Sequence, residues 1–437
     1  MKLISLRVTK AFGYLPIRVD FNEDVTFLVG PNGSGKTTAL RIIHAILGPA
    51  FEDLYSISFE AANIMLDDGS RTRNIEVRRK KGIVITVDGI DESLELPEID
   101  VDRIDSLRPS SSRSGSIMEM TRSKLMSSRV FEYLHKLTSP MFLGLDRRLL
   151  AGEGEDEFLD YERQRHVRNP MDRRGYRNSA GGGIYDVHSL AQEAYRRFRR
   201  SQETMTGRLR REVMLSAFKY TEVNDFGRML NFDSRVLLGR REEIGHALEN
   251  LGISGPEVTK QLNDFFSRLE KLFRKKSDSG GFEVEMLTNK AQIERIEQLI
   301  RLIDEHKSST EQAYSQINSF ITTINSFLSD TRKEIEVDQV GALKVVRPDK
   351  VRVGIEGLSS GEKQLLVIFG HLFFNRFGAR SNVFIIDEPE LSLHLRWQEM
   401  FVERAVRASP NAQLVLATHS PEIISSMKSR SINLGIK

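Results

Sequence analysis

A glycine-rich segment near the start of the chain ends in a lysine and a threonine, side chains that suit phosphate and a divalent cation. Residues 30–37 read Gly-Pro-Asn-Gly-Ser-Gly-Lys-Thr, after an apolar run predicted as a strand and before a run predicted as a helix. Glycines let backbone N–H groups turn toward phosphate oxygens, and a helix N-terminus adds positive partial charge. A plain glycine-rich turn would not need Lys36 and Thr37, so we predict a nucleotide-binding P-loop.

Each residue type in this loop has a separate expected role. We expect Lys36 to reach the outer phosphates of ATP, and Thr37 to offer its hydroxyl group to Mg²⁺. The residues expected to bind the nucleotide here are Gly30, Asn32, Gly33, Ser34, Gly35, Lys36, Thr37 and Thr38.

Two neighbouring carboxylates end an apolar run near the C-terminus. The run at 383–386 fits a buried strand, which would place Asp387 at the sheet edge, able to hold Mg²⁺ through water. Glu388 could then polarise an attacking water molecule. Many strands end in Asp-Glu, so the pattern is weak alone. Together with a P-loop it predicts the acidic half of an ATPase site.

Two further segments could contact a nucleotide. His419 follows an apolar run at 413–417 and could contact the γ-phosphate, although a single histidine at a strand end is ordinarily structural. Residues 358–364, Leu-Ser-Ser-Gly-Glu-Lys-Gln, predict the start of a helix, with Ser359 as N-cap and Glu362 closing a capping box. The same helix start also forms an anion site, because its free N–H groups and dipole point outward.

Apolar periodicity predicts the elements that must position these residues. The predicted strands are 25–29, 57–59, 75–77, 83–87, 142–145, 343–346, 351–355, 383–386 and 413–417. A helix is expected at 37–47, directly after the P-loop. Helices alternate with apolar strands in the C-terminal part, which is typical of a parallel α/β sheet, whereas the strands at 57–87 indicate an antiparallel β subdomain.

The middle of the chain has a different pattern. Residues 187–335 predict helices, one of which carries apolar residues at alternating steps of three and four. These residues are Ile293, Ile296, Ile300, Ile303, Tyr314, Ile317, Ile321, Ile324 and Leu328. Their spacing is typical of a coiled-coil-like seam, but a helix packed on its own domain would show it equally well. The serine-rich segment 106–115 and the glycine-rich segment 153–189 predict loops.

These patterns divide the chain into three expected segments. Residues 1–145 are the N-terminal lobe of an ATPase head, with the P-loop and the β subdomain. Residues 146–335 are a basic flexible segment and a helical, coiled-coil-like insertion, and residues 336–437 are the C-terminal lobe. The two lobes must meet in space, because each holds part of one expected site.

Composition excludes several classes of protein. The formal net charge of +3 does not by itself indicate a nucleic-acid partner, and the absence of cysteine excludes disulfides and thiolate metal sites. No apolar run reaches the ~18 residues of a membrane span, and the first residues lack the pattern of a signal peptide. We therefore expect a cytoplasmic protein that does not contact a membrane.

Arginine is concentrated in one part of the chain. Between Arg163 and Arg211, arginines outnumber acids, while the remainder of the chain is close to neutral or acidic. Such a stretch could bind nucleic acid through its phosphates. A solvated helix face would have the same composition, so both interpretations stand.

The four chemistry-bearing segments together resemble the ABC-type ATPases. Residues 358–362 resemble the signature motif of that family, residues 387–390 resemble its Walker B motif and D-loop, and His419 resembles its switch histidine. The resemblance implies an ABC-type P-loop ATPase head that binds ATP and Mg²⁺. It also implies that Ser359 and Gly361 contact the γ-phosphate bound by a second protomer, so that both sites close in a head-to-tail homodimer.

The same segments are similar to the SMC/RecF/OLD-like branch, and within it to AAA-like ATPases of bacterial anti-phage systems (the Septu, retron and PARIS ATPases). This resemblance covers residues 1–105 and 336–437. Related heads carry a glutamine after the P-loop lobe that senses Mg²⁺, whereas the first glutamine here is Gln164, so that role is reassigned or lost. Phe12 or Tyr14 could stack on adenine, although an aromatic residue near a strand end is more often part of the core.

The resulting hypothesis is a Mg²⁺-dependent ATPase that acts as a nucleotide-driven dimeric switch, or as a higher oligomer. The resemblance implies a role in anti-phage defence with a separate effector, a nuclease or a toxin, since the tail after His419 is too short for a nuclease domain. The alternative is a RecF- or SMC-like ATPase of DNA repair or recombination. A transporter motor is disfavoured by the long insertion, and a non-hydrolysing scaffold by the presence of Glu388.

Overall fold

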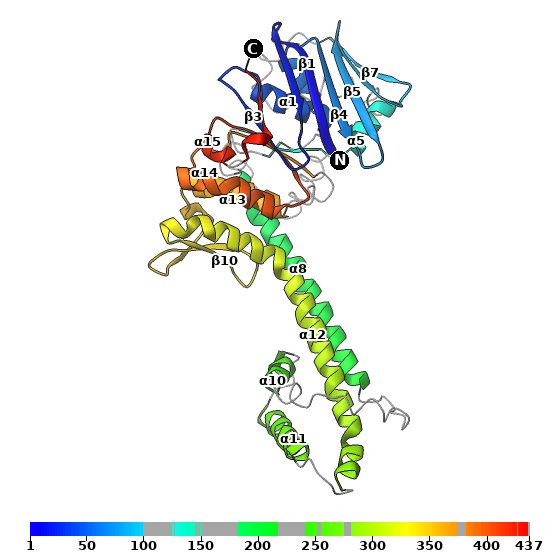
Figure 1. The fold of residues 1–437 in the computed structure, drawn as a ribbon, viewed down its shortest axis with the longest axis vertical. Helices are drawn as coiled ribbons and strands as arrows, with labels where there is room; N and C mark the ends of the chain where they lie inside the picture. Colours follow the sequence, from blue (N-terminus) through cyan, green and yellow to red (C-terminus); the bar gives the residue numbers. More distant parts are fainter. Residues whose placement is uncertain are drawn as a thin grey trace, which may run out of the picture. The chain divides into compact units, whose positions relative to one another are not determined.

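The computed structural model describes residues 1–98, 125, 127–137, 139–144, 149–150, 182–216, 241–250, 255–274, 281–374, 382–425 and 427–435 (Figure 1). The chain separates into two compact units. The first holds Met1–Glu193 and Ile317–Lys437, and the second holds Ala194–Gln316. These limits differ from the boundaries at 145/146 and 335/336 that the sequence suggests, and the three-segment division stays a prediction.

A largely parallel sheet in the first unit joins the two ends of the chain. Its order is β15-β3-β14-β13-β8-β9, and its neighbours pair in parallel except for β8 with β9. The strands are β3 (Val25–Val29), β8 (Met141–Leu143), β9 (Leu149–Leu150), β13 (Val383–Asp387), β14 (Gln413–Ala417) and β15 (Ser431–Asn433). Because β14 pairs with both β3 and β13, the prediction that the two lobes meet is confirmed.

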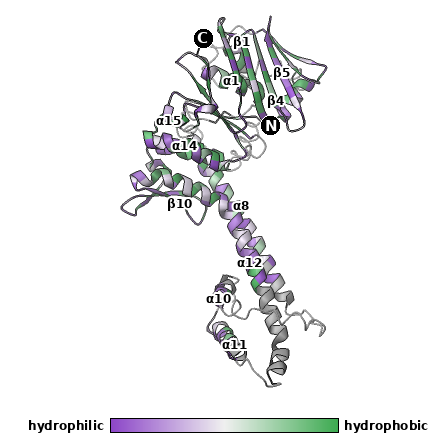
Figure 2. Ribbon diagram, viewed as in Figure 1, coloured by the Kyte–Doolittle hydropathy of each residue, from purple (hydrophilic) through white to green (hydrophobic). Residues whose placement is uncertain are grey.

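A second, antiparallel sheet forms the predicted β subdomain. Its order is β2-β1-β4-β5-β6-β7. The strands are β1 (Lys2–Ala11), β2 (Leu15–Asp20), β4 (Ala61–Asp67), β5 (Thr72–Arg79), β6 (Ile83–Val87) and β7 (Ser93–Leu96). Buried and exposed residues alternate along them, and the buried face shares one core with α1 (Lys36–Leu47). Hydrophobic and hydrophilic residues are correspondingly mixed along these strands in Figure 2. The helix α5 (Arg129–Lys136) contacts β6 and β7.

Residues 57–59 are not a strand, which corrects the sequence prediction. They follow a short helix, α2 (Phe51–Ser56), and their backbone groups bond to side chains and turns outside a strand ladder. The Arg79 guanidinium donates hydrogen bonds to the carbonyl oxygens of Leu54 (2.6 Å) and Ile57 (2.9 Å), and the Ser58 carbonyl accepts the Phe12 N–H (2.8 Å). A distant arginine therefore satisfies the carbonyls at the end of α2, and no local pattern announces this.

The prediction of a loop at residues 153–189 is wrong for its last part. Residues 182–189 belong to α8 (Gly182–Ser216), whose Ile184, Val187 and Ala191 are buried on one side of the helix. This apolar stripe outweighs the low helix propensity of Gly182 and Gly183. Residues 153–181 and the predicted loop at 106–115 lie outside the described residues.

The signature segment begins a helix that packs between other helices of the first unit. This helix, α13 (Ser360–Phe374), contacts α14 (Leu395–Ala408), α8 and α12 (Gly281–Leu328). A Cβ added at Gly370 of α13 would lie 2.2 Å from Cγ1 of Val187, so α8 is seated directly on the α13 backbone. The Phe320 ring, from α12, lies 4.7 Å from the Phe374 ring.

Short elements complete the first unit. A three-stranded antiparallel sheet is formed by β10 (Glu334–Val337), β11 (Leu343–Val346) and β12 (Arg352–Val353). The remaining elements are the helix α15 (Pro421–Ile424) and the 3₁₀ turns η2 (Ser329–Thr331), η3 (Ile355–Gly357) and η5 (Lys428–Arg430).

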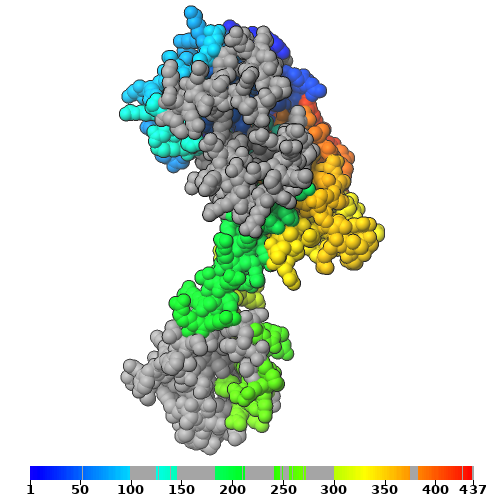
Figure 3. All heavy atoms as spheres, turned by 180° about the vertical axis from the view of Figure 1, so that it is seen from behind, coloured from blue at the N-terminus to red at the C-terminus, as the bar shows by residue number. Residues whose placement is uncertain are grey.

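The second unit is helical. It contains the later turns of α8, visible as the green surface in Figure 3, together with α10 (Arg241–Asn250), α11 (Pro256–Arg274) and most of α12. Within it α8 and α12 touch, because the Phe198 and Tyr314 rings lie 5.0 Å apart and Thr206 Oγ1 lies 3.2 Å from His306 Nε2. The coiled-coil character of these helices stays a prediction. None of the helices that the structure describes is both long enough and apolar enough to cross a membrane.

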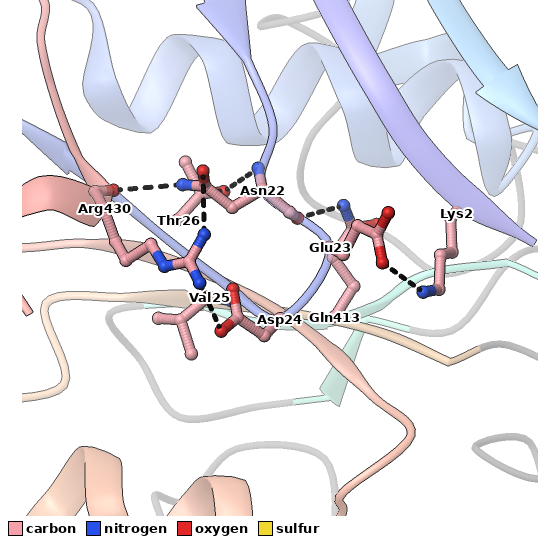
Figure 4. A network of polar contacts seen from close by, with 8 residues as sticks. All are labelled: Lys2, Asn22, Glu23, Asp24, Val25, Thr26, Gln413 and Arg430. Carbon is pink, nitrogen blue, oxygen red and sulfur yellow. Dashed lines mark hydrogen bonds and ion pairs between the residues drawn. The ribbon is translucent and has the colours of Figure 1, made fainter.

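One buried glutamine links the two large sheets. The Gln413 side chain, at the start of β14, accepts the Leu3 N–H of β1 (2.7 Å) and donates to the Leu3 carbonyl (2.8 Å) and the Asn22 carbonyl (2.7 Å). Figure 4 shows the surrounding network, in which Arg430 bonds to Asn22 and pairs with Asp24 at 3.1 Å. The start of β3, and with it the P-loop that follows, is fixed from both ends of the chain.

Candidate nucleotide-binding site

The loop between β3 and α1 requires glycine at two positions. Gly30 and Gly35 have φ values of 147° and 91°, which L side chains rarely adopt. A Cβ at Gly30 would lie 2.7 Å from Ser34 Oγ, and one at Gly35 would lie 2.9 Å from Leu15 Cδ2. The loop is therefore wound closely against β2 and against itself, a conformation that lets backbone N–H groups turn toward phosphate oxygens.

Lys36 is held across the loop. Its residue is 6% exposed, and Nζ donates to the carbonyl oxygens of Gly30 (2.9 Å) and Pro31 (3.1 Å). Burial lowers the pKa of Lys36, and the nearby carboxylates of Glu388 and Asp387 act in the opposite direction. These acids, distant in sequence, are close enough to affect the P-loop lysine.

The loop also contains polar groups that fit a phosphate and its cation. Ser34 Oγ is buried and has no hydrogen-bond partner among the described residues, so it has a hydroxyl available for a ligand oxygen. Thr37 and Thr38 are half-buried at the start of α1, whereas Asn32 and Gly33 are exposed at the tip of the loop. This donor set fits a nucleotide with Mg²⁺, which the Thr37 hydroxyl and the buried Asp387 carboxylate could help to hold.

The two acids lie at the carboxyl end of β13, as predicted. Asp387 is 1% exposed and lies opposite Ala417 in the parallel register, while the Glu388 N–H donates to the Ala417 carbonyl at 2.8 Å. Glu388 has a φ of 48°, a left-handed conformation that is unfavourable for a glutamate. Such local strain is concentrated at functional sites, and here it turns the chain immediately after the strand.

Glu390 is a residue of the site to which sequence analysis gave no separate role. Its carboxylate accepts the Thr418 hydroxyl (2.8 Å) and the His419 N–H (2.7 Å). Thr418 is fully buried and His419 is exposed, so this clamp fixes the backbone from which the His419 side chain emerges. The available signal in the sequence was a third acid, Glu390, three residues after Asp387. Its partners could not be inferred, because Thr418 and His419 follow the next strand, β14.

The predicted capping box at the start of α13 is present. The Ser359 hydroxyl accepts the Glu362 N–H (3.4 Å), and the Glu362 carboxylate accepts the Ser359 N–H (2.7 Å). A Cβ at Gly361 would lie 2.4 Å from the Ser392 carbonyl oxygen, so this helix start is pressed against the loop that follows β13. Ser359 itself is exposed.

The two aromatic residues considered for adenine stacking are not part of the core. Phe12 and Tyr14, in the turn between β1 and β2, are 52% and 66% exposed, so the core interpretation is wrong. Phe12 has a φ of 50°, and its N–H is bonded to Ser58, which fixes the turn. Their contact with adenine stays a prediction.

Parallel strands bring three of the four predicted segments to one sheet edge. The P-loop follows β3, the two acids end β13, and Thr418-His419 follow β14, which lies between the other two strands. Ser359 and Gly361 instead border the loop after β13. This sheet, with its P-loop and acidic strand end, defines the head of an ABC-type P-loop ATPase.

The chain belongs to the family described as "AAA domain, putative AbiEii toxin, Type IV TA system", whose model matches residues 25–425. It is similar to the "Retron Vc95 probable ATPase" of Vibrio cholerae serotype O1 biovar El Tor, with 26% identity over 47% of this chain and 44% of the relative. The "Retron Ec83 probable ATPase" of Escherichia coli is 22% identical over 30% of this chain and 28% of the relative. The chain thus spans less than half of these curated relatives, and the predicted resemblance to retron ATPases is confirmed.

Among the solved structures that match this chain are head domains of SMC proteins. The Smc head domain of Pyrococcus furiosus, with an extended coiled coil, matches 99% of this chain and 93% of its own at 14% identity, with a TM-score of 0.40. The SMC head domain of Thermotoga maritima matches 97% of this chain and 91% of its own at 12% identity, with a TM-score of 0.36.

A buried histidine in α13 is expected to make folding sensitive to acid. His371 is 1% exposed, and neither ring nitrogen has a hydrogen-bond partner among the described residues. Burial lowers the pKa of His371 to about 4, because the charged imidazolium cannot be hydrated there. Below its ordinary pKa of 6.5 the unfolded chain therefore binds a proton that the folded chain excludes.

We predict that His371→Met reduces the acid sensitivity of folding. In the wild type, this histidine should remove on the order of 3 kcal/mol of unfolding free energy as the pH falls from 6.5 to 4. Above pH 6.5 the variant should be as stable as the wild type or more stable, since no unpaired polar ring is buried. Urea unfolding across this pH range measures the difference, with the exposed His246→Gln as control. An unchanged pH slope would contradict the assignment.

Proposed function

We propose that this chain is a Mg²⁺-dependent ATPase that acts as a nucleotide-driven dimeric switch. The observation that carries this proposal is the convergence of Lys36, Asp387 and Glu388 at one edge of the parallel sheet. A P-loop lysine beside a buried acid and a second, half-buried acid is the arrangement that phosphoryl transfer to water requires.

Each residue has a proposed role in hydrolysis. The P-loop N–H groups and Lys36 bind the phosphates, while Thr37 and, through water, Asp387 would hold Mg²⁺, which would neutralise charge on the phosphates. Glu388 accepts a proton from the attacking water. His419, fixed through Glu390, contacts the γ-phosphate.

The dimer follows from the position of the signature residues. Ser359 is exposed at the N-terminus of α13, where the positive end of the helix dipole favours an anion. In the proposed head-to-tail dimer, Ser359 and Gly361 of each protomer close over the ATP bound by the other. Nucleotide would then decide whether two chains are held together.

The cellular role is proposed from the relatives. Two of them are named retron ATPases, which supports a role in anti-phage defence with a separate effector, a nuclease or a toxin. The alternative, a RecF- or SMC-like role in DNA repair, uses the same ATPase cycle. These two roles differ in the partner, and the ATPase site serves both.

A second proposal is that α8 binds nucleic acid. Arg196, Arg197, Arg199 and Arg200 are exposed on this helix. Exposed guanidinium groups suit phosphate oxygens. Of the arginine-rich stretch, residues 163–181 lie outside the described residues, so the proposal rests on the arginines of α8.

Substitution of the lysine and of the second acid should separate binding from turnover. Lys36→Ala should weaken ATP binding by about 100-fold or more, because the phosphates lose their charged donor. Glu388→Gln should bind ATP normally, hydrolyse it about 100-fold more slowly, and accumulate as an ATP-bound dimer. Fluorescent-nucleotide titration, phosphate release and light scattering measure the three effects. The exposed Lys81→Ala is the matched control, and full turnover by Glu388→Gln would show that the proton acceptor is another group.

Mixing two inactive variants should restore part of the activity if the site is shared. Ser359→Arg inactivates the signature half of a composite ATP site, and Lys36→Ala inactivates the P-loop half. Equal mixing gives heterodimers with one intact composite site, and about a quarter of wild-type turnover is expected. Phosphate release at several mixing ratios tests this. A mixture that stays inactive at every ratio would exclude the head-to-tail dimer.

If α8 binds nucleic acid, its affinity should fall steeply with salt and show little sequence preference. Changing Arg196, Arg197, Arg199 and Arg200 to Gln should reduce the slope of log affinity against log salt by about 1 per contacting arginine. Fluorescence anisotropy with labelled DNA and RNA measures the slope. Arg347→Gln/Arg352→Gln, on the three-stranded sheet, is the control. Equal slopes in all proteins would assign these arginines to a solvated surface.

A further inference from the structure

The first turn of α13 contains a buried carboxylate, two of whose three hydrogen-bond donors lie outside the nucleotide motifs. Glu362 is 1% exposed, and its carboxylate accepts hydrogen bonds from Lys333 Nζ (2.8 Å), the Thr331 hydroxyl (3.0 Å) and the Ser359 N–H (2.7 Å). The sequence predicts only the last of these. One side chain therefore joins the signature serine to a lysine and a threonine near residue 330.

Lys333 and Thr331 directly follow the C-terminal end of α12. The Lys333 N–H donates to the carbonyl of Leu328, the last residue of that helix, at 3.4 Å, and the Thr331 hydroxyl lies 3.1 Å from the same oxygen. One turn earlier, the Phe327 ring packs 5.3 Å from the Phe369 ring of α13. The end of α12 and the start of α13 are thus fastened by apolar and charged contacts.

A buried carboxylate depends on its cationic partner. Burial alone would raise the pKa of Glu362, but its hydrogen bonds outweigh burial and lower the pKa, so the group is charged at neutral pH. Without Lys333 the carboxylate would have to take up a proton or turn toward water, because an uncompensated buried charge is strongly unfavourable. Either change weakens or removes the acceptor of the Ser359 N–H.

We propose that Lys333 is a positioning residue for Ser359, acting through Glu362, so that the end of α12 sets the conformation of the signature turn. The inference rests on the proposed role of Ser359 at the nucleotide of a second copy. On the other side of the turn, the Ser392 carbonyl oxygen closes the space beside Gly361. The turn is therefore held between the end of α12 and the loop after β13.

The experiment compares Lys333→Met, Lys333→Arg, Glu362→Gln and the double variant Lys333→Met/Glu362→Gln in the full chain. Lys333→Met should reduce kcat for ATP hydrolysis by at least about 10-fold, while the affinity of the monomer for a fluorescent ATP analogue stays within about twofold. Lys333→Arg should retain most activity. The double variant should have a higher kcat than Lys333→Met. The neutral amide of Gln at position 362 needs no cation, and its oxygen can still accept the Ser359 N–H. Lys350→Met, in an exposed turn, is the control.

Amide hydrogen exchange over residues 358–363, without nucleotide, tests the same inference independently of ATPase activity. Exchange should be faster in Lys333→Met and return toward the wild-type rate in the double variant. Wild-type kcat in Lys333→Met, or unchanged exchange there, would overturn the inference. If the wild-type chain does not hydrolyse ATP, the proposed function fails, and the exchange comparison alone then decides whether Lys333 positions the signature turn.

Discussion

The fold depends on the pairing of β14 with strands from both ends of the chain. β3 lies on one side of it and β13 on the other, so the P-loop and the acidic strand end become neighbours only through this strand. Gln413 strengthens the join, because its side chain pairs with the backbone of Leu3, 410 positions away. A contact of such long range is entropically costly, and continuous apolar burial along three adjacent strands offsets that cost.

Charges in the head are buried in complementary sets. Lys36 is surrounded by loop carbonyls with acids nearby, Glu362 is paired with Lys333, and Glu390 receives two hydrogen bonds from the strand end after β14. Each set spans elements that are distant in sequence. Removing one partner would leave a charge in a poorly hydrated place, so these sets constrain the relative positions of strands and helices.

Features with a local cause could be predicted from the sequence. The P-loop, the apolar strands β3, β13 and β14, and the capping box at Ser359 depend on neighbouring residues, and all lie where the patterns indicated. Features with a distant cause could not be predicted. The bonds of Arg79 to the end of α2, the clamp of Glu390 on Thr418 and the pairing of Lys333 with Glu362 join residues that no periodicity connects. The start of α8 was missed because adjacent glycines conceal a buried apolar stripe.

The contact of Val187 with Gly370 also bears on how such a chain can change over generations. A Cβ at position 370 would collide with the side chain of Val187, so a larger residue at position 370 would require a change at position 187. Val187 of α8 and Phe320 of α12 both contact α13. Between them in sequence, residues 194–316 form a unit with its own internal packing. Insertions, deletions and recombination are tolerated at boundaries between compact units. Residues 194–316 can therefore change in length and surface while the parts of α8 and α12 that contact α13 stay constant.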